Sequence, residues 1–150
     1  MLTLAAAGCG GGGGVAKGAT VTVYVSAPLH GDRAIEGKAI CAGAERQAGR
    51  AGEVRVRVVC LDDTGGGGHW SLAAVGANAR RVAEDSTAVG YIGDADPTAR
   101  RFSQPILESA GIASIYRSSG TTAMARLLHA IRDAGSGSLR VSVREALGEL

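Results

Sequence analysis

Apolar positions along the chain follow two different periods. Four short stretches are rich in β-branched residues or alternate apolar and polar residues, which is typical of β-strands. Between them, apolar residues recur every three or four positions, as on the buried face of an amphipathic helix. The predicted strands are residues 21–25, 54–61, 87–92 and 112–115, and the predicted helices are residues 32–48, 71–85, 96–110, 121–135 and 139–150.

Polar residues mark the expected start of each helix. Asp96 followed by Pro97 is the clearest signal, because the carboxylate accepts from free backbone N–H groups and proline has no N–H to leave unpaired. The last helix is ambiguous, since residues 139–143 also alternate like a strand, and we favour the helix. The predicted N-caps are Asp32, Ser71, Asp96, Thr121 or Thr122, and Ser138.

Strands that alternate with helices predict the fold class α/β. The expected architecture has three layers, a mostly parallel, flavodoxin-like sheet with helices on both faces and right-handed crossovers. Residues 54–61 alternate at first, which predicts an edge strand with a buried second half. Ligands of such sheets gather at the carboxyl ends of the strands. Those ends are rich in Gly, Ser, Thr and Asp and suit a small polar ligand: residues 26–31, 62–68, 93–98 and 116–120.

The composition argues against a nucleic-acid-binding protein and against a membrane-spanning one. The chain has 150 residues, enough for one domain, with 20% charged residues, 3% aromatic residues and a net charge of +2. The basic residues are scattered rather than concentrated, so a nucleic-acid partner is not expected. No apolar run approaches the roughly 18 residues that a membrane-spanning helix needs.

The first residues resemble the end of a bacterial lipoprotein signal. Residues 2–8 are apolar or small and precede Cys9, which would carry the lipid, and Gly10–Gly14 would form a flexible tether. A basic n-region is missing, and a disordered Ala/Gly leader is the alternative. We therefore expect residues 1–19 to be a signal remnant and tether, with membrane contact only through the lipid anchor.

The remaining cysteines and the histidines give little sign of chemistry. Cys41 and Cys60 fall on a predicted helix and strand that should pack together, so a disulfide would form in an oxidising compartment, but two free buried cysteines are favoured. The three histidines are far apart, and no metal or cofactor is expected. Asp62 and Asp63 could bind Mg²⁺ in a phospho-receiver, yet no lysine follows Lys38, so the chain is not expected to be an enzyme.

Several segments, taken in order, resemble type 1 periplasmic binding proteins, in particular the branched-chain amino-acid-binding group. Together they span residues 21–119 with matching spacing. The matching segments are residues 23–29, 37–40, 43–45, 58–64, 77–82, 91–93, 105–112 and 118–119.

This resemblance implies an extracytoplasmic solute-binding protein of an ABC importer, a two-lobed clamp that closes on an amino acid or similar solute. By position, the ligand's charged ends would meet Asp96 and Thr98, then Ser118 and Ser119. The N–H of Thr98 could receive a carboxylate directly. The competing structural roles are helix capping for the first pair and a turn for the second.

The resemblance also implies that the second lobe is missing. After Ser119 the sequence passes almost at once to residues 123–135 and 141–147, which resemble late helices that return to the first lobe. We therefore expect residues 20–150 to form one truncated lobe that binds weakly unless a second chain, as in a homodimer, supplies the other wall. The expected partners are a small polar solute and an ABC permease. The alternative is a non-binding remnant or a lobe for protein interaction or sensing.

Overall fold

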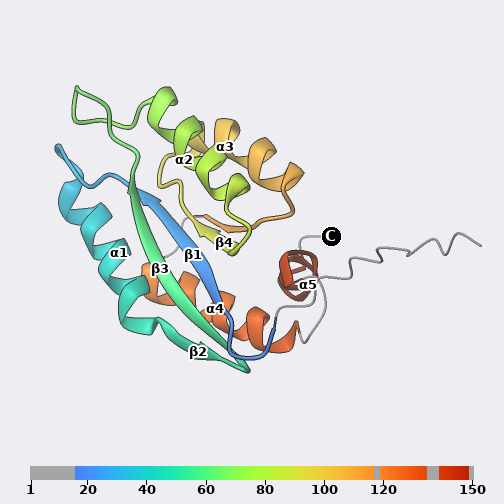
Figure 1. Ribbon diagram of the computed structural model, residues 1–150. Helices are drawn as coiled ribbons and strands as arrows, with labels where there is room; N and C mark the ends of the chain where they lie inside the picture. The colour runs from blue at the N-terminus through green and yellow to red at the C-terminus, as the bar shows by residue number, and fades with distance from the viewer. Residues whose placement is uncertain (1–15, 117–118, 135–138, 149–150) are drawn as a thin grey trace, which may run out of the picture.

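The computed structural model describes residues 16–116, 119–134 and 139–148, and these form a mostly parallel sheet (Figure 1). The strand order is β2-β3-β1-β4-β5. β1 pairs in parallel with β3 and β4, β4 pairs in parallel with β5, and β2 runs antiparallel to β3. The strands are β1 (Thr20–Ala27), β2 (Gly49–Ala51), β3 (Val54–Asp62), β4 (Ala88–Ile92) and β5 (Ala113–Ile115).

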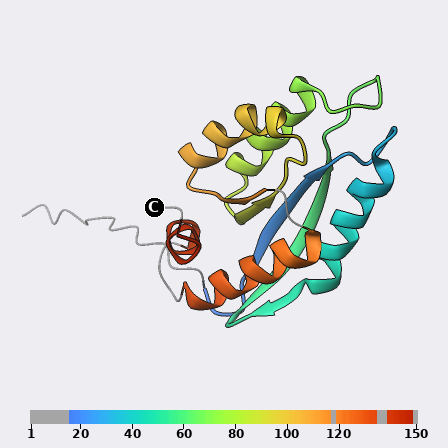
Figure 2. The same cartoon turned by 180° about the vertical axis from the view of Figure 1, so that it is seen from behind.

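Helices cover both faces of the sheet, which confirms the predicted three-layer α/β fold. On one face α1 packs against α4 and α4 against α5, and on the other face α2 packs against α3 (Figures 1 and 2). Each face has its own apolar core. The helices are α1 (Ala34–Gln47), α2 (Leu72–Glu84), α3 (Pro97–Ser109), α4 (Gly120–Asp133) and α5 (Leu139–Ala146).

The central strand β1 is buried on both faces. Val21, Val23 and Val25 belong to the core beneath α1 and α4, whereas Tyr24 belongs to the core beneath α2 and α3. This is the pattern of a strand in the middle of a parallel sheet, where every position faces a helix layer. Each buried valine contributes roughly 1.5–3 kcal/mol relative to an exposed one.

The outer edge of the sheet differs from the prediction. β2 was not predicted, and it pairs with residues 54–56 at the start of β3. The expected buried second half of β3 is wrong, because Val58, Val59 and Cys60 are only half-buried. The short β2 covers only the first part of β3, and no other strand among the described residues lies on the outer side of the rest.

Two of the predicted helix caps are wrong. Arg33 rather than Asp32 precedes α1, and no side chain caps that helix, because residues 31–34 close a backbone turn. Ser119 rather than Thr121 or Thr122 caps α4 and accepts from the N–H of Thr122. The caps Ser71 and Asp96 are confirmed, and Ser138 lies outside the described residues.

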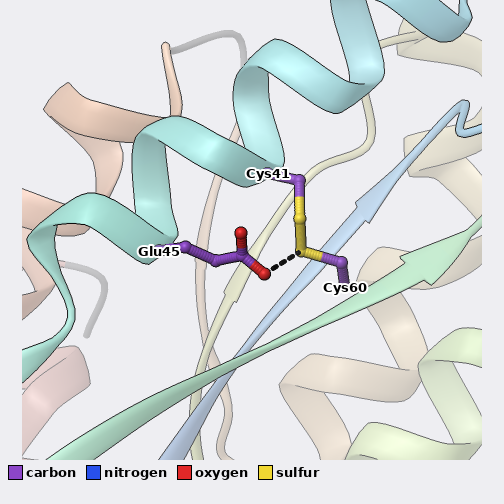
Figure 3. A group of neighbouring side chains, drawn as sticks. All are labelled: Cys41, Glu45 and Cys60. Carbon is purple, nitrogen blue, oxygen red and sulfur yellow. Dashed lines mark hydrogen bonds between the residues drawn. A yellow bond between two sulfur atoms is a disulfide. The ribbon is translucent and has the colours of Figure 1, made fainter.

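A disulfide joins Cys41 of α1 to Cys60 of β3, with the Cα atoms 6.0 Å apart (Figure 3). The expectation of two free cysteines is therefore wrong. The helix and strand pack as predicted, and a Cα separation of this size is within the usual range for a disulfide. The bond fastens α1 to the half-buried part of β3.

The last helix closes the amino-terminal edge of the sheet. Arg140 of α5 donates to the carbonyl oxygens of Ala88, Ala110 and Asp85, which lie next to the start of β4 or the ends of α3 and α2. α5 therefore packs at the edge opposite to the carboxyl ends of the parallel strands. Those carboxyl ends are left clear of the closing helix.

Candidate ligand-binding site

Two clefts lie side by side at the carboxyl edge of the sheet, and Ala95 lines both. The first, which we call the switch-point cleft, has a volume of about 420 Å³ and is lined by Ser26, Glu36, Ile40, Ile92, Gly93, Asp94, Ala95 and Ser119. The second, the tryptophan cleft, has a volume of about 230 Å³ and is lined by Pro28, Arg33, Asp63, Gly68, His69, Trp70, Ala95 and Asp96. Described residues from all four predicted strand-end loops line these two clefts.

The switch-point cleft lies where the strand order reverses. The chain passes from β1 to β3 on one side and then to β4 on the other, so the loops after β1 and β4 diverge. Ligands of open α/β sheets bind at this position. Gly93 closes the base of the cleft with φ +137°, and a Cβ there would collide with the carbonyl oxygen of Ser26. Only glycine allows this approach.

Asp94 lies at the base of the switch-point cleft and is held by other side chains. It is 1% exposed. The Tyr91 hydroxyl donates to it over 2.7 Å and the Ser103 hydroxyl over 2.5 Å. Burial raises the pKa of Asp94 above its usual value, although these hydrogen bonds oppose the rise. The carboxylate therefore fastens β4 to α3.

Asp63 lies in the tryptophan cleft and has no comparable partners. It is 2% exposed, and no other described residue donates a hydrogen bond to its Oδ1. Burial, followed by the nearby charges of Asp94 and Asp62, raises the pKa of Asp63 to about 7. The group is thus partly protonated near neutral pH, and a cation in the cleft would shift it to the carboxylate.

The neighbouring Asp62 shows the opposite behaviour. Burial alone would raise its pKa, but hydrogen bonds from His30, Leu29 and Thr64 lower it to about 2. His30 Nδ1 lies 2.6 Å from the carboxylate, and the N–H of Leu29 lies 2.9 Å from it. Asp62 therefore ties the loop after β1 to the end of β3, which is a structural role.

The structure separates the predicted binding residues. Asp96 lines the tryptophan cleft and caps α3, accepting from the N–H of Thr98 over 2.7 Å. Thr98 is exposed, lines neither cleft and has its N–H engaged by that cap. Ser119 lines the switch-point cleft and caps α4. Ser118 and Cys9, the predicted lipidation residue, lie outside the described residues.

Sequence reasoning did not single out Asp94 or the binding potential of Asp63. The sequence places both residues in loops that follow strands, Asp94 after β4 and Asp63 after β3. It indicates a chemical role only for the Asp62-Asp63 pair, as a possible Mg²⁺ site. The signal that could have found Asp63 is the pair itself, because two neighbouring aspartates cannot both accept hydrogen bonds from the same nearby donors. Only the three-dimensional structure shows that Asp62 takes them and Asp63 does not.

One group within the described residues has the spacing of metal ligands. Cys41, Glu45 and Cys60 place their ligand atoms within 4.8 Å of one another, and Glu45 Oε1 lies 3.8 Å from Cys60 Sγ (Figure 3). Both sulfurs belong to the disulfide, so neither offers the thiolate that a metal would need. No such group among the described residues includes Asp62 or Asp63.

The chain has the fold of one lobe of a type 1 periplasmic solute-binding protein. Solved structures that share this fold include two binding proteins. A leucine-binding protein, LivK from Thermotoga maritima, is 18% identical with a TM-score of 0.55 over 64% of this chain and 27% of its own. An ABC-transporter solute-binding protein from R. palustris, solved with 4-hydroxybenzoate, is 19% identical with a TM-score of 0.54 over 65% of this chain and 26% of its own.

These comparisons concern the fold. This chain spans about a quarter of the length of each solved structure. No sequence-family model matches it, and no curated protein is significantly similar in sequence. Among the described residues, no helix is both long and apolar enough to cross a bilayer.

Proposed function

We propose that this chain is the extracytoplasmic solute-binding lobe of an ABC importer and binds a small polar solute, such as an amino acid, at the carboxyl edge of its sheet. The observation that carries this proposal is the pair of adjoining clefts at that edge, with polar groups on their walls. The two solved structures of the same fold are both binding proteins, one for leucine and one holding 4-hydroxybenzoate. The disulfide suits an oxidising compartment.

The predicted residues divide between the two ends of such a solute. Ser119 and the start of α4 suit a carboxylate, because the helix dipole favours negative charge there. Asp96 carries a negative charge and suits a cationic end instead. Ser118 would extend the first set, and Thr98 would act through the Asp96 cap.

The lobe offers one wall, so a partner would complete the enclosure. Ile35 and Leu72 are 87% and 54% exposed and lie in the first turns of α1 and α2, at the rim. A second lobe or a second copy packed on these side chains would bury apolar surface and cover the solute. A permease and a lipid on Cys9 belong to the same proposal.

Thermal unfolding of the chain with and without solute tests the proposal. A panel of amino acids and small carboxylates at millimolar concentration should include at least one that raises Tm, because a ligand at 100 times its Kd stabilises by about 2.7 kcal/mol. Ser119→Ala should reduce this shift, and Ser109→Ala, a helix serine that lines neither cleft, should not. If no solute shifts Tm at any concentration up to 100 mM, the solute-binding proposal is wrong.

The alternative is a lobe used for protein interaction, and the exposed Ile35 and Leu72 favour it. Sedimentation velocity over a hundredfold range of concentration distinguishes the two. Self-association that Ile35→Ser abolishes, with no solute response, would support the interaction role.

A further inference from the structure

The strongest unexplained feature is the buried carboxyl of Asp63 in the tryptophan cleft. It follows directly from β3, is 2% exposed, and its Oδ1 has no hydrogen-bond donor among the described residues. Buried polar groups in folded proteins nearly always have a partner, and each exception costs about 1–3 kcal/mol. A group that lacks a partner and also lines a cleft can be satisfied by a ligand.

The charges around the cleft favour a cation. Asp62 and Asp94 are close enough to raise the pKa of Asp63, and Asp96 lines the same cleft. Arg33 is the opposing charge in the cleft and lowers the pKa of Asp63, while its guanidinium also donates to Glu36 over 2.7–2.9 Å. His69, the other titratable group in the cleft, is exposed. A positively charged group entering the cleft would therefore meet a net negative field.

The walls of the cleft suit an organic cation. Trp70 contributes an aromatic surface, and Asp96 lines the same cleft. An ammonium group over an indole ring gains cation–π attraction. Gly68 and Gly31 lie against each other, and a Cβ on Gly31 would collide with Gly68, so the two loops close the cleft without side chains.

A divalent metal ion fits the cleft less well. Mg²⁺ and Ca²⁺ need at least several oxygen ligands around one point. No three metal-ligating side chains at this edge come within 4.8 Å of one another in the described part of the chain. A single ammonium needs one carboxylate and a neighbouring surface, which Asp63 and Trp70 provide.

We propose that Asp63 receives the ammonium group of the solute in the tryptophan cleft, so that the solutes of this chain are primary amines, amino acids included, rather than simple carboxylates. This inference rests on the proposed solute-binding function. It adds the class of solute and the residue that selects it.

Three probes that share the isobutyl group of leucine test the inference by calorimetric titration of the full chain at pH 7.5. L-leucine carries both charged groups, 3-methylbutylammonium lacks the carboxylate, and 4-methylpentanoate lacks the ammonium. The two amines should bind at least tenfold more tightly than the acid. Asp63→Asn should remove this preference, whereas Asp133→Asn, an exposed change on α4, should keep it.

A second measurement does not depend on a variant that folds. In the unaltered chain with ¹³C-labelled aspartate, 3-methylbutylammonium should move the side-chain carboxyl resonance of Asp63 and lower the pH at which it titrates. 4-Methylpentanoate should do neither. Asp133, which lies on α4 and lines neither cleft, serves as the internal reference.

The outcomes separate the two proposals. If solutes bind but the acid binds as tightly as the amines, or Asp63→Asn leaves the preference intact, the assignment of Asp63 is overturned and solute binding stands. If no probe binds and no aspartate resonance moves, both are overturned. An amine preference that is lost only in Asp63→Asn, together with the resonance shift, supports both.

Discussion

Asp94 and Asp63 are both almost completely buried at the same edge of the sheet, in adjoining clefts, yet their surroundings differ. Asp94 accepts hydrogen bonds from Tyr91 and Ser103, whereas Oδ1 of Asp63 accepts none from the described residues. Burial raises the pKa of both. Burial therefore does not distinguish the roles of these two carboxyl groups, whereas their hydrogen-bond partners do.

The difference follows from the elements behind each residue. Asp94 lies over α3, whose Ser103 points back at it, so one loop is fastened to one helix. Asp63 follows Asp62, which takes the donors offered by the loop after β1. Asp62 therefore holds the loop after β1 in place, and Asp63 remains available to bind a ligand.

Removing the hydrogen-bonded carboxylate of Asp94 should have the largest effect on the free energy of unfolding. Asp94→Ala leaves the hydroxyls of Tyr91 and Ser103 without their acceptor, at about 1–3 kcal/mol each, so we expect a loss of about 4 kcal/mol in the free energy of unfolding. Urea denaturation measures it. Asp133→Ala, which removes an exposed carboxylate, is the control, and an equally small effect of both would contradict the structural role of Asp94.

Removing the disulfide should lower the free energy of unfolding by somewhat less than Asp94→Ala does. It should not change the difference between Asp94 and Asp63. Cys41 and Cys60 are 19 residues apart, and a loop of that size is worth about 3 kcal/mol. The Cys41→Ala/Cys60→Ala variant should lose that amount in urea denaturation. The Asp94 and Asp63 variants should change stability in this background as they do in the unaltered chain, and strong coupling would show that the tether positions the clefts.

Replacing the unpartnered carboxylate should stabilise the chain. Because the folded pKa of Asp63 is about 7 and its ordinary value is 3.8, the folded state holds the extra proton between those values, and stability falls as pH rises from about 4 to 7. The full effect is about 4 kcal/mol. Asp63→Asn should recover about 2 kcal/mol at pH 8, since the amide is also buried without a partner.

Thermal unfolding at pH 4 and pH 8 checks this sign. The advantage of Asp63→Asn should be present at pH 8 and absent at pH 4. A variant that is less stable than the unaltered chain at pH 8 would mean that Asp63 has a partner after all.

Shortening the aromatic wall should have the smallest effect on stability. Trp70 is half-buried, and its ring centroid lies 6.5 Å from that of Phe102. Trp70→Ala should change the free energy of unfolding by less than about 1 kcal/mol while weakening 3-methylbutylammonium severalfold, as expected for a lost cation–π contact. Calorimetric titration measures the second effect, and an unchanged Kd would remove Trp70 from the site.

Much of the fold could be predicted from the sequence because local and global signals agree. The alternation of β1, the cap of α3 at Asp96 and the helical spacing of Met124, Leu127 and Ile131 each specify one element. β2 could not be predicted, since Gly-Arg-Ala has no pattern and forms a strand only by pairing with β3.

The site was less predictable than the fold. The ends of the predicted strands indicated the edge of the sheet at which a ligand would bind, and Asp96 and Ser119 do line clefts at that edge. Whether a buried aspartate is satisfied depends on donors far away in sequence, such as Ser103 for Asp94. The disulfide depended in the same way on how closely α1 approaches β3, which the sequence pattern does not report.

The most direct test of solute binding at this edge is a map of backbone amide NMR shifts during titration with L-leucine. The account predicts changes concentrated around Ser26, Asp63, Trp70, Asp94 and Ser119. Unchanged spectra, or changes confined to the α5 edge around Arg140, would contradict it.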